Sequence, residues 1–240
     1  MTNYGTLYLI PAPLSDAPLT DVIPNGALAL ILQLRHFVVE ELRSARRYLS
    51  QAGHKGNIEQ LTFFVLNEHT KSQELTAMLH PLLAGENMGL LSEAGLPAIA
   101  DPGANLVALA HQKGILVAPL TGPSSLMLAL MASGLNGQSF AFVGYLPTDG
   151  DQRKIRIRAL ERRAIQENQT QIFMETPYRN VSLYKELLEL CAPQTMLCVA
   201  SNLTAADAFV ATKTVAQWRL SLLPPIHKIP ALFLINNDYH

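Results

Sequence analysis

The sequence predicts a two-domain α/β protein, with a parallel sheet in the N-terminal half and a mixed sheet in the C-terminal half. Short apolar strands alternate with helical segments from residue 6 to about residue 120, which is typical of a parallel sheet. From about residue 121 onward, several strands are separated by turns alone, which indicates a mixed sheet. We therefore expect domains at 1–120 and 121–240.

In the N-terminal half, strands are indicated by short apolar or β-branched runs and helices by apolar residues three or four positions apart. The expected strands are 6–10, 37–39, 62–66, 89–92 and 115–118. The expected helices are 25–33, 41–52, 70–84 and 104–113. Gly53 and Gly85 follow two of these helices and predict where they end.

The same criteria predict the elements of the C-terminal half. The expected helices are 124–133, 149–167 and 179–190. The expected strands are 139–145, 171–174, 196–201, 209–212 and 231–236.

Composition limits the class of protein and the kind of partner. The chain has 240 residues, of which 49% are hydrophobic, and its net charge is −1. No global field would recruit nucleic acid, so a polyanion would have to meet a local basic patch. Cys191 and Cys198 fit no zinc or redox spacing and are expected to be buried thiols in a reducing compartment. The seven histidines lack ligand spacing, so we expect no metal site.

Targeting signals and common nucleotide-binding motifs are not found. The N-terminal residues lack the basic start and long apolar core of a signal peptide, and no apolar run reaches the ~20 residues of a membrane helix. A cytoplasmic protein without membrane association is therefore expected. LIPAPLSD stands where a GxGxxG loop would follow the first strand, and there is no Walker loop and no GxSxG. These absences argue against a nicotinamide dehydrogenase, a P-loop enzyme, an α/β-hydrolase and a Rossmann-type methyltransferase.

Two turns rich in glycine and proline mark the expected ligand site. They are GLPAIADPG, after strand 89–92, and LTGPSS, after strand 115–118. Ligands of open parallel sheets lie at the carboxyl ends of strands. Gly95 and Gly122 would permit close backbone approach, while the prolines stiffen the turns. Such a site suits a nucleotide-like ligand better than a bare phosphate or a metal.

Several motifs occur along the chain in one order. They are LYLIPAPLSD, VVEELRSARRYL, NEHTKSQE, LLSEAGLPAIADPG, GPSSLMLALMASGL, FVGYLP and FMETPYRN. With these motifs the chain resembles the tetrapyrrole methylase superfamily of S-adenosylmethionine-dependent methyltransferases. Within it, the chain is most similar to the ribosomal small-subunit RNA methyltransferase I branch, which methylates a cytidine 2′-hydroxyl in 16S rRNA.

The resemblance implies a tetrapyrrole-methylase-like fold with S-adenosylmethionine in a cleft between the two domains, S-adenosylhomocysteine as product, and a homodimer. It also implies rRNA or the small ribosomal subunit as partner. The cofactor contacts of the family fall on Pro11, Leu96, Ile99, Ser124, Ser125, Met174, Leu203, Pro230 and Ala231. The chain departs from the branch at Glu93 and Leu96, where the branch usually has Asp and Thr, and at Asn202, where it has Glu. Methyl transfer is therefore better supported than the ribosomal substrate.

Methyl transfer to a weakly nucleophilic hydroxyl needs alignment and is helped by a nearby base. Three groups at strand ends are candidates for catalysis or substrate binding. They are Glu40, Glu41 and Arg43; Glu68 and His69; and Glu175 and Tyr178. Each group has a structural alternative: an acidic helix N-terminus for the first, helix capping for the second and a strand-end turn for the third.

The dense basic patch of the chain lies within the expected helix 149–167. It comprises Arg153, Lys154, Arg156, Arg158, Arg162 and Arg163. We expect Ile155, Ile157 and Leu160 to turn away from it. Arg153, Arg156 and Arg158 are the expected phosphate contacts, and a solvated helix face is the alternative.

Two further functions stay open at this point. A small-molecule methyltransferase acting on a tetrapyrrole-like compound would have a large apolar cleft without a basic rim. A protein that binds S-adenosylmethionine without rRNA activity would keep its affinity but methylate no RNA.

Overall fold

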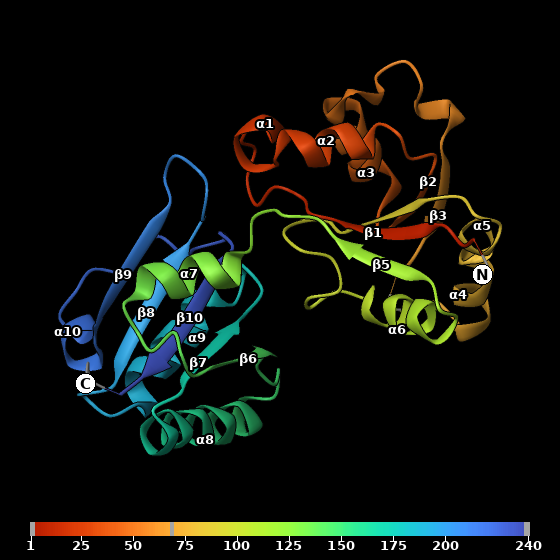
Figure 1. Ribbon diagram of the computed structural model, residues 1–240. Coiled ribbons are helices and arrows are strands. Elements are labelled where there is room, and N and C mark those ends of the chain that lie inside the picture. The colour runs from red at the N-terminus through yellow and green to blue at the C-terminus, as the bar shows by residue number, and fades with distance from the viewer. Residues whose placement is uncertain (1–2, 68–69, 238–240) are drawn as a thin grey trace. The chain divides into compact units, whose positions relative to one another are not determined.

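The computed structural model describes residues 3–67 and 70–237. Internal contacts divide the chain into two compact units, Met1–Ser124 (unit 1) and Ser125–His240 (unit 2). Each unit contains one five-stranded sheet covered by helices on both faces (Figure 1). The division after residue 120 that the sequence suggests stays a prediction.

Unit 1 is built on a parallel sheet with the strand order β3-β2-β4-β1-β5. Its strands are β1 (Thr6–Ile10), β2 (His36–Val39), β3 (Thr62–Val65), β4 (Met88–Leu91) and β5 (Leu116–Pro119). Because all strands point the same way, their carboxyl ends share one edge. The turns that follow β4, β1 and β5 are therefore neighbours.

Helices cover both faces of this sheet (Figure 1). One face carries α1 (Leu19–Val22), α2 (Asn25–Ile31) and α3 (Leu42–Leu49). The other carries α4 (Ser72–Met78), α5 (His80–Leu83) and α6 (Ala104–Gln112). A π-helical turn (Ser50–His54) and a 3-10 turn (Ile58–Gln60) connect α3 to β3. Alternate residues of β2 serve the two cores: Phe37 and Val39 pack toward α3, whereas Val38 packs toward α4 and α6.

The single helix expected at 70–84 is wrong, because the structure divides it into α4 and α5. Pro81 lies in the first turn of α5. A proline inside a longer helix would lack an amide donor and would clash with the carbonyl one turn earlier. The helix expected at 41–52 likewise ends early, at Leu49, and the chain turns out of the π-helical turn at Gly53, whose φ is +115°.

Unit 2 contains a mixed sheet with the strand order β6-β7-β10-β8-β9. Its strands are β6 (Phe140–Tyr145), β7 (Thr170–Met174), β8 (Met196–Ser201), β9 (Phe209–Thr214) and β10 (Ala231–Asn236). Only the β6–β7 pair is parallel, and the other three pairs are antiparallel. The predicted combination of a parallel and a mixed sheet is thus confirmed.

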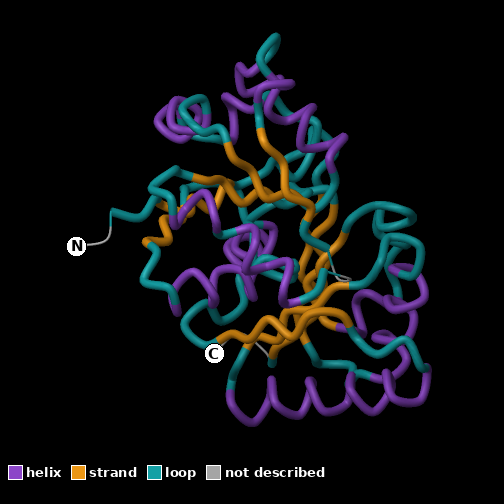
Figure 2. The backbone as a smooth tube through the Cα atoms, turned by 90° about the vertical axis from the view of Figure 1, so that its right-hand side faces the viewer, coloured by secondary structure: helices purple, strands orange, loops and turns teal. Residues whose placement is uncertain are grey.

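Helices α8 (Gly150–Glu167), α9 (Asn180–Leu190) and α10 (Val215–Arg219) cover one face of the second sheet, and α7 (Ser125–Ser133) covers the other (Figures 1 and 2). Leu197 and Val199 of β8 face α9 and α10, whereas Cys198 faces α7. Cys191 and Cys198 are free and buried, as expected. Burial raises the pKa of Cys191 to about 12 and that of Cys198 to about 11, so both stay protonated thiols.

Arg153 at the start of α8 forms a bidentate ion pair with Glu186 of α9, with N···O distances of 2.7 and 2.8 Å. The Arg153 guanidinium lowers the pKa of the Glu186 carboxyl below its ordinary value of 4.5. A carboxyl with a lowered folded-state pKa adds stability above its unfolded pKa and loses it as the pH falls through the folded value.

We expect Arg153→Met to lower the free energy of unfolding of unit 2 more at pH 7 than at an acidic pH. As the pH falls through the folded-state pKa of Glu186, protonation of that carboxyl removes the attraction in the wild-type protein too. Urea unfolding of both proteins at the two pH values measures this difference. An equal loss at both pH values would show that the side chain acts through packing rather than charge.

No helix within the described residues is long and apolar enough to cross a membrane.

Candidate functional site

Three turns meet at the carboxyl edge of unit 1, as the strand order requires. The turn after β1 and the turn after β4 are joined by two backbone hydrogen bonds. Ala12 N–H donates to Gly95 O at 2.8 Å, and Gly95 N–H donates to Ala12 O at 3.0 Å. The two Gly/Pro-rich turns identified in the sequence thus flank the turn after β1, which carries LIPAPLSD.

Pro11 is fixed from two sides within this group of turns. The Tyr48 hydroxyl of α3 donates a hydrogen bond to its carbonyl oxygen at 3.0 Å. On the other side lies Gly122, where an added Cβ would stand 2.2 Å from Pro11 Cβ. Only glycine allows this approach of the two chains, and the turn after β5 therefore lies directly against the turn after β1.

The turn after β4 is strained. Ala98 and Ala100 have φ values of 66° and 61°, in the left-handed region that disfavours side chains. Ile99 stands between them and is 45% exposed. The next residue, Asp101, is half-buried; burial raises the pKa of its carboxyl, the nearby Glu93 raises it further, and the Ser92 hydroxyl opposes the shift. Strained backbone beside a perturbed carboxyl is common at functional sites.

Glu41 caps α3. Its carboxylate accepts hydrogen bonds from the backbone amides of Arg43, at 2.9 Å, and Ser44, at 2.8 Å. These bonds lower the pKa of Glu41, which makes it a weaker base. The Ser44 hydroxyl lies 3.1 Å from the same carboxylate and donates to Glu93 Oε1 at 2.6 Å. Glu41 therefore acts as an acidic residue at a helix N-terminus, which is its structural alternative. Glu93 is linked to it through the Ser44 hydroxyl.

Unit 2 places a second set of residues at one sheet edge. Met174 ends β7 and lies opposite Leu232, and Ala231 begins β10 opposite Ser201. Leu203 packs in the same apolar cluster as Met174. The backbone amide of Asn202 donates to Pro230 O at 3.0 Å. Met174, Leu203, Pro230 and Ala231, which are far apart in the sequence, thus gather around the ends of three adjacent strands.

The turn after β7 has an inward and an outward side chain. Glu175 is buried; its Oε1 accepts from the Thr176 amide at 2.7 Å and pairs with Arg179 at 2.7 Å. Tyr178 is 79% exposed. Glu175 therefore stabilises the turn, whereas Tyr178 is available to a ligand.

The remaining candidates of unit 1 are distributed around the same edge. Glu40 follows β2 and borders the small hollow that also contains Asp101 and Pro97. Arg43 is exposed in the first turn of α3. Glu68 and His69 lie outside the described residues.

Three residues of this edge were not predicted from the sequence: Tyr48, Ser44 and Asp101. Asp101 could have been found, because it is the acidic residue of the ADPG turn.

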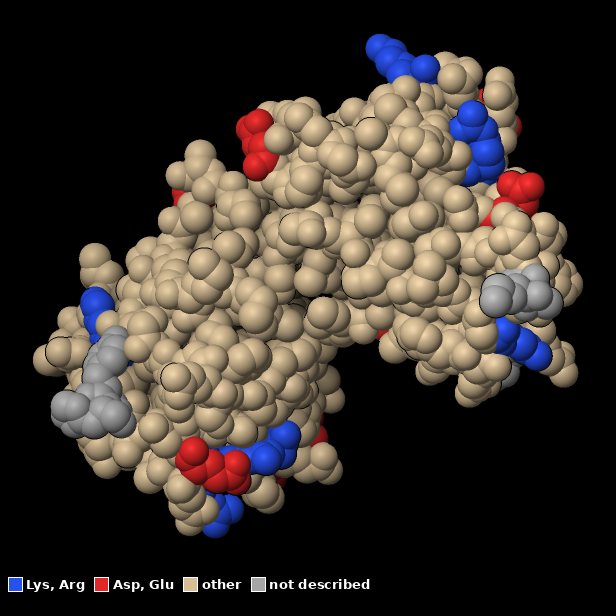
Figure 3. Space-filling model, viewed as in Figure 1, with Lys and Arg blue, Asp and Glu red and all other residues tan. Residues whose placement is uncertain are grey.

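The basic patch of α8 is only partly free. Arg153 is engaged by Glu186, Lys154 lies 3.8 Å from Asp151, and Arg163 lies 3.2 Å from Glu167. Figure 3 accordingly shows basic and acidic side chains next to each other on the surface over α8.

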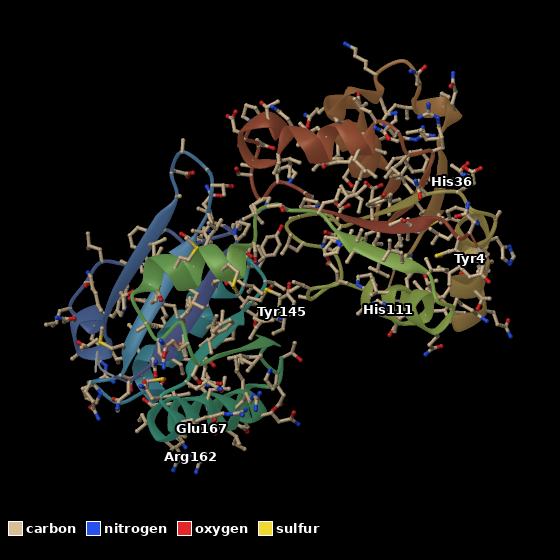
Figure 4. All side chains as sticks on the ribbon, viewed as in Figure 1. Tyr4, His36, His111, Tyr145, Arg162 and Glu167 are labelled. Atoms are coloured by element: carbon tan, nitrogen blue, oxygen red, sulfur yellow. The ribbon has the colours of Figure 1, made fainter. Side chains whose placement is uncertain are left out.

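Four arginines of α8 are exposed: Arg163, which pairs with Glu167, and Arg156, Arg158 and Arg162. Arg162 projects outward from the helix (Figure 4). Ile157 and Leu160 are buried and so turn away from the basic patch, as expected, but the same expectation for Ile155 is wrong. Ile155 is 67% exposed and borders a shallow groove with Arg158 and Arg162. At two residues before Ile157, it lies on the opposite side of the helix from the core.

Among the described residues, no group of three or more His, Cys, Asp or Glu side chains could hold a metal ion.

Comparison with known proteins decides the family. The model of a family described as Tetrapyrrole (Corrin/Porphyrin) Methylases matches residues 6–218. The chain belongs to the tetrapyrrole methylase family. The resemblance inferred from the motifs is thereby confirmed, and with it the methyltransferase class of enzyme.

Curated relatives of this tetrapyrrole methylase carry the name Ribosomal RNA small subunit methyltransferase I. The protein from Vibrio cholerae is 33% identical over 82% of this chain, and that from Escherichia coli O157:H7 is 30% identical over 84%. The matches cover 65% and 66% of those two proteins, so the chain spans just under two thirds of their length. The Xylella fastidiosa protein is 32% identical and is covered over 75% of its length.

Solved structures share the fold. The methyltransferase CobJ matches with a TM-score of 0.62 at 15% identity, over 98% of this tetrapyrrole methylase and 94% of CobJ. A uroporphyrin-III C-methyltransferase from Thermus thermophilus, crystallised with S-adenosylhomocysteine, matches with a TM-score of 0.55 at 16% identity, over 97% of each chain.

Proposed function

We propose that this tetrapyrrole methylase transfers a methyl group from S-adenosylmethionine to the ribose 2′-hydroxyl of a cytidine in 16S rRNA. The observation that carries the proposal is similarity, at about 30% identity over most of the chain, to proteins named small-subunit rRNA methyltransferases. We place the reaction in the cytoplasm and keep the homodimer as a prediction.

The joined turns of unit 1 suit the proposed cofactor. In unit 1, backbone groups dominate the three joined turns, and the Gly122–Pro11 contact leaves no room for side chains between them. Pro11, Leu96, Ile99 and Ser124 would hold the cofactor from unit 1, and Ser125, Met174, Leu203, Pro230 and Ala231 would hold it from unit 2. When bound, S-adenosylmethionine supplies a methyl group on a sulfonium, and the acceptor oxygen forms its bond to carbon as the C–S bond breaks.

The candidate catalytic residues differ in how well their surroundings suit them to the reaction. Glu41 is hydrogen-bonded to two amides and has a lowered pKa, so it is better suited to shape α3 than to remove a proton. Arg43 stays a candidate, and His69 and Glu68 lie outside the described residues. Glu40 stays a candidate for substrate contact and Tyr178 is exposed, whereas Glu175 is committed to its own turn.

Transfer of labelled methyl groups from S-adenosylmethionine tests the proposal. Small ribosomal subunits lacking the modification should accept label, and a uroporphyrinogen substrate should not. Label in the tetrapyrrole alone would establish the small-molecule alternative. Binding of S-adenosylhomocysteine without transfer to either substrate would indicate the non-catalytic alternative.

We expect three of the exposed arginines of α8 to contribute to RNA affinity. Neutralising Arg156, Arg158 and Arg162 together should flatten the slope of log affinity against log salt by about 2–3 units, since each phosphate contact adds roughly 0.7–0.9. Arg163→Ala is the control, because Glu167 already pairs with that guanidinium. Filter binding at several salt concentrations measures the slope, and an unchanged slope in the triple variant would make this helix an ordinary solvated face.

A further inference from the structure

A cavity of about 350 Å³ opens in unit 1 beside the joined turns. Its walls are the loop Pro13–Ala17, one side of α3 and the start of the turn after β4. It adjoins the expected cofactor turns, since Ala12 and Ala94 line it. None of the four unit 1 cofactor positions, Pro11, Leu96, Ile99 and Ser124, is among its lining residues. The cavity is therefore a place for a second ligand next to the cofactor.

The polar groups of the cavity carry both charges. Arg47 and Ser44 of α3, Gln51 of the π-helical turn and Glu93 of the turn after β4 line the cavity. Glu93 is held in place because Oε1 accepts the Ser44 hydroxyl at 2.6 Å, while its exposed carboxylate can still accept further hydrogen bonds. Arg46, the neighbour of Arg47, points elsewhere, lying 3.5 Å from Glu59 and 5.7 Å from the centre of the Phe63 ring.

We propose that this cavity binds the acceptor nucleoside of the RNA substrate, an inference that rests on the proposed function. Glu93 accepts a hydrogen bond from a ribose hydroxyl or an exocyclic amino group, and Arg47 contacts an adjoining phosphate. Ser44 is a positioning residue that orients Glu93. Glu93 thus recognises hydrogen-bond donors of the sugar or base, while Arg47 recognises the phosphate.

Size and charge favour a single nucleoside over a tetrapyrrole. The volume lies at the low end of the range for small-ligand pockets, about 300–1,000 Å³. A tetrapyrrole with several carboxylate side chains is larger, and its negative charge would meet Asp16 and Glu93. A single nucleoside flipped out of its base stack would meet the Glu93 carboxylate, which Ser44 holds in place, and the Arg47 guanidinium.

Two substitutions and a matched control test the proposal. Glu93→Gln and Arg47→Ala should each lower kcat/KM for unmodified small ribosomal subunits about 10–100-fold, as loss of a hydrogen bond to a charged group does. Arg46→Ala removes the same charge from the same helix outside the cavity, and it should stay within about 2-fold of wild type. Calorimetry should find S-adenosylhomocysteine affinity unchanged in all three, and circular dichroism should find them folded.

Ser44 provides a separate readout. Ser44→Ala should lower kcat more than it raises KM, and Ser44→Thr, which keeps the hydroxyl, should restore most of the activity. A purely structural role would not be rescued in this way without a matching change in stability.

The possible results separate the nucleoside site from the other assignments of this cavity. Equal activity of Arg47→Ala and Arg46→Ala, with full activity of Glu93→Gln, would overturn the nucleoside site while leaving RNA methylation intact. Lost S-adenosylhomocysteine affinity in Glu93→Gln would assign the cavity to the cofactor instead. A wild-type protein that methylates no RNA would refute the proposed function first, and the nucleoside site with it.

Discussion

Gly122→Ala is expected to weaken binding of the proposed cofactor by about 1–3 kcal/mol, the usual cost of local backbone strain at such a site. The new Cβ would stand 2.2 Å from Pro11 Cβ and 2.3 Å from Pro11 Cγ, so one of the two turns must move. Pro11 cannot easily yield, because its carbonyl is held by the Tyr48 hydroxyl and the next residue, Ala12, pairs with Gly95. Calorimetric titration with S-adenosylhomocysteine measures the loss.

Two other glycines separate lost affinity from lost stability. At Gly5, just before β1 and at the opposite edge of the sheet, an added Cβ would lie 1.9 Å from Glu86 O. Gly5→Ala should destabilise unit 1 but leave the affinity of the folded protein unchanged. At Gly26 in α2 nothing lies within 4 Å, so Gly26→Ala should leave the affinity unchanged and should not lower stability, since alanine favours a helix. Wild-type affinity in folded Gly122→Ala would remove the joined turns from the cofactor site.

Trp218→Ala should lower the free energy of unfolding by about 3–5 kcal/mol, in the range for a large buried aromatic side chain. Trp218 is 2% exposed, and its indole N–H donates to Leu197 O of β8 at 2.7 Å. Its ring meets Tyr184 edge to face at 5.9 Å, and the Lys213 ammonium lies 4.7 Å from its centre. The substitution leaves a cavity between α9, α10 and the sheet and removes the hydrogen bond to Leu197 O.

Urea unfolding followed by circular dichroism measures this loss. Trp218→Phe, which keeps most of the apolar volume but not the N–H donor, should fall between the alanine variant and wild type. Leu222→Ala is the surface control, since Leu222 is 92% exposed and such changes usually stay within about 0.5 kcal/mol. A loss below about 1 kcal/mol for Trp218→Ala would contradict the packing described here.

The elements predicted best from the sequence have a clear hydrophobic period or a residue that marks where they begin or end. Strand 231–236 was predicted with the bounds that the structure shows, because five apolar residues follow Pro230 without a break and end at two asparagines. Helix α8 was predicted within one residue, because Asp149 caps it and Ile157 and Leu160 mark its buried side. The short helices α1 and α10 were missed, since a turn of four or five residues has too few positions to show a period.

Site residues were harder to predict, because their roles depend on contacts between distant segments. The Gly/Pro turns were found from local composition, but the Gly122–Pro11 contact joins residues more than a hundred positions apart. The Ser44–Glu93 hydrogen bond is of the same kind. Arg153 was misinterpreted for the same reason. Its place in a basic run suggested a free cation, whereas Glu186, on another helix, forms an ion pair with it.

Nucleoside mass spectrometry of 16S rRNA tests the central claim most directly. The rRNA would come from cells with and without the gene for this chain, and from the second strain complemented with wild type or with Gly122→Ala. We expect one 2′-O-methylcytidine to disappear on deletion, to return with wild type and to return only partly with the variant. An unchanged content of 2′-O-methylcytidine in the deletion strain would contradict the assignment.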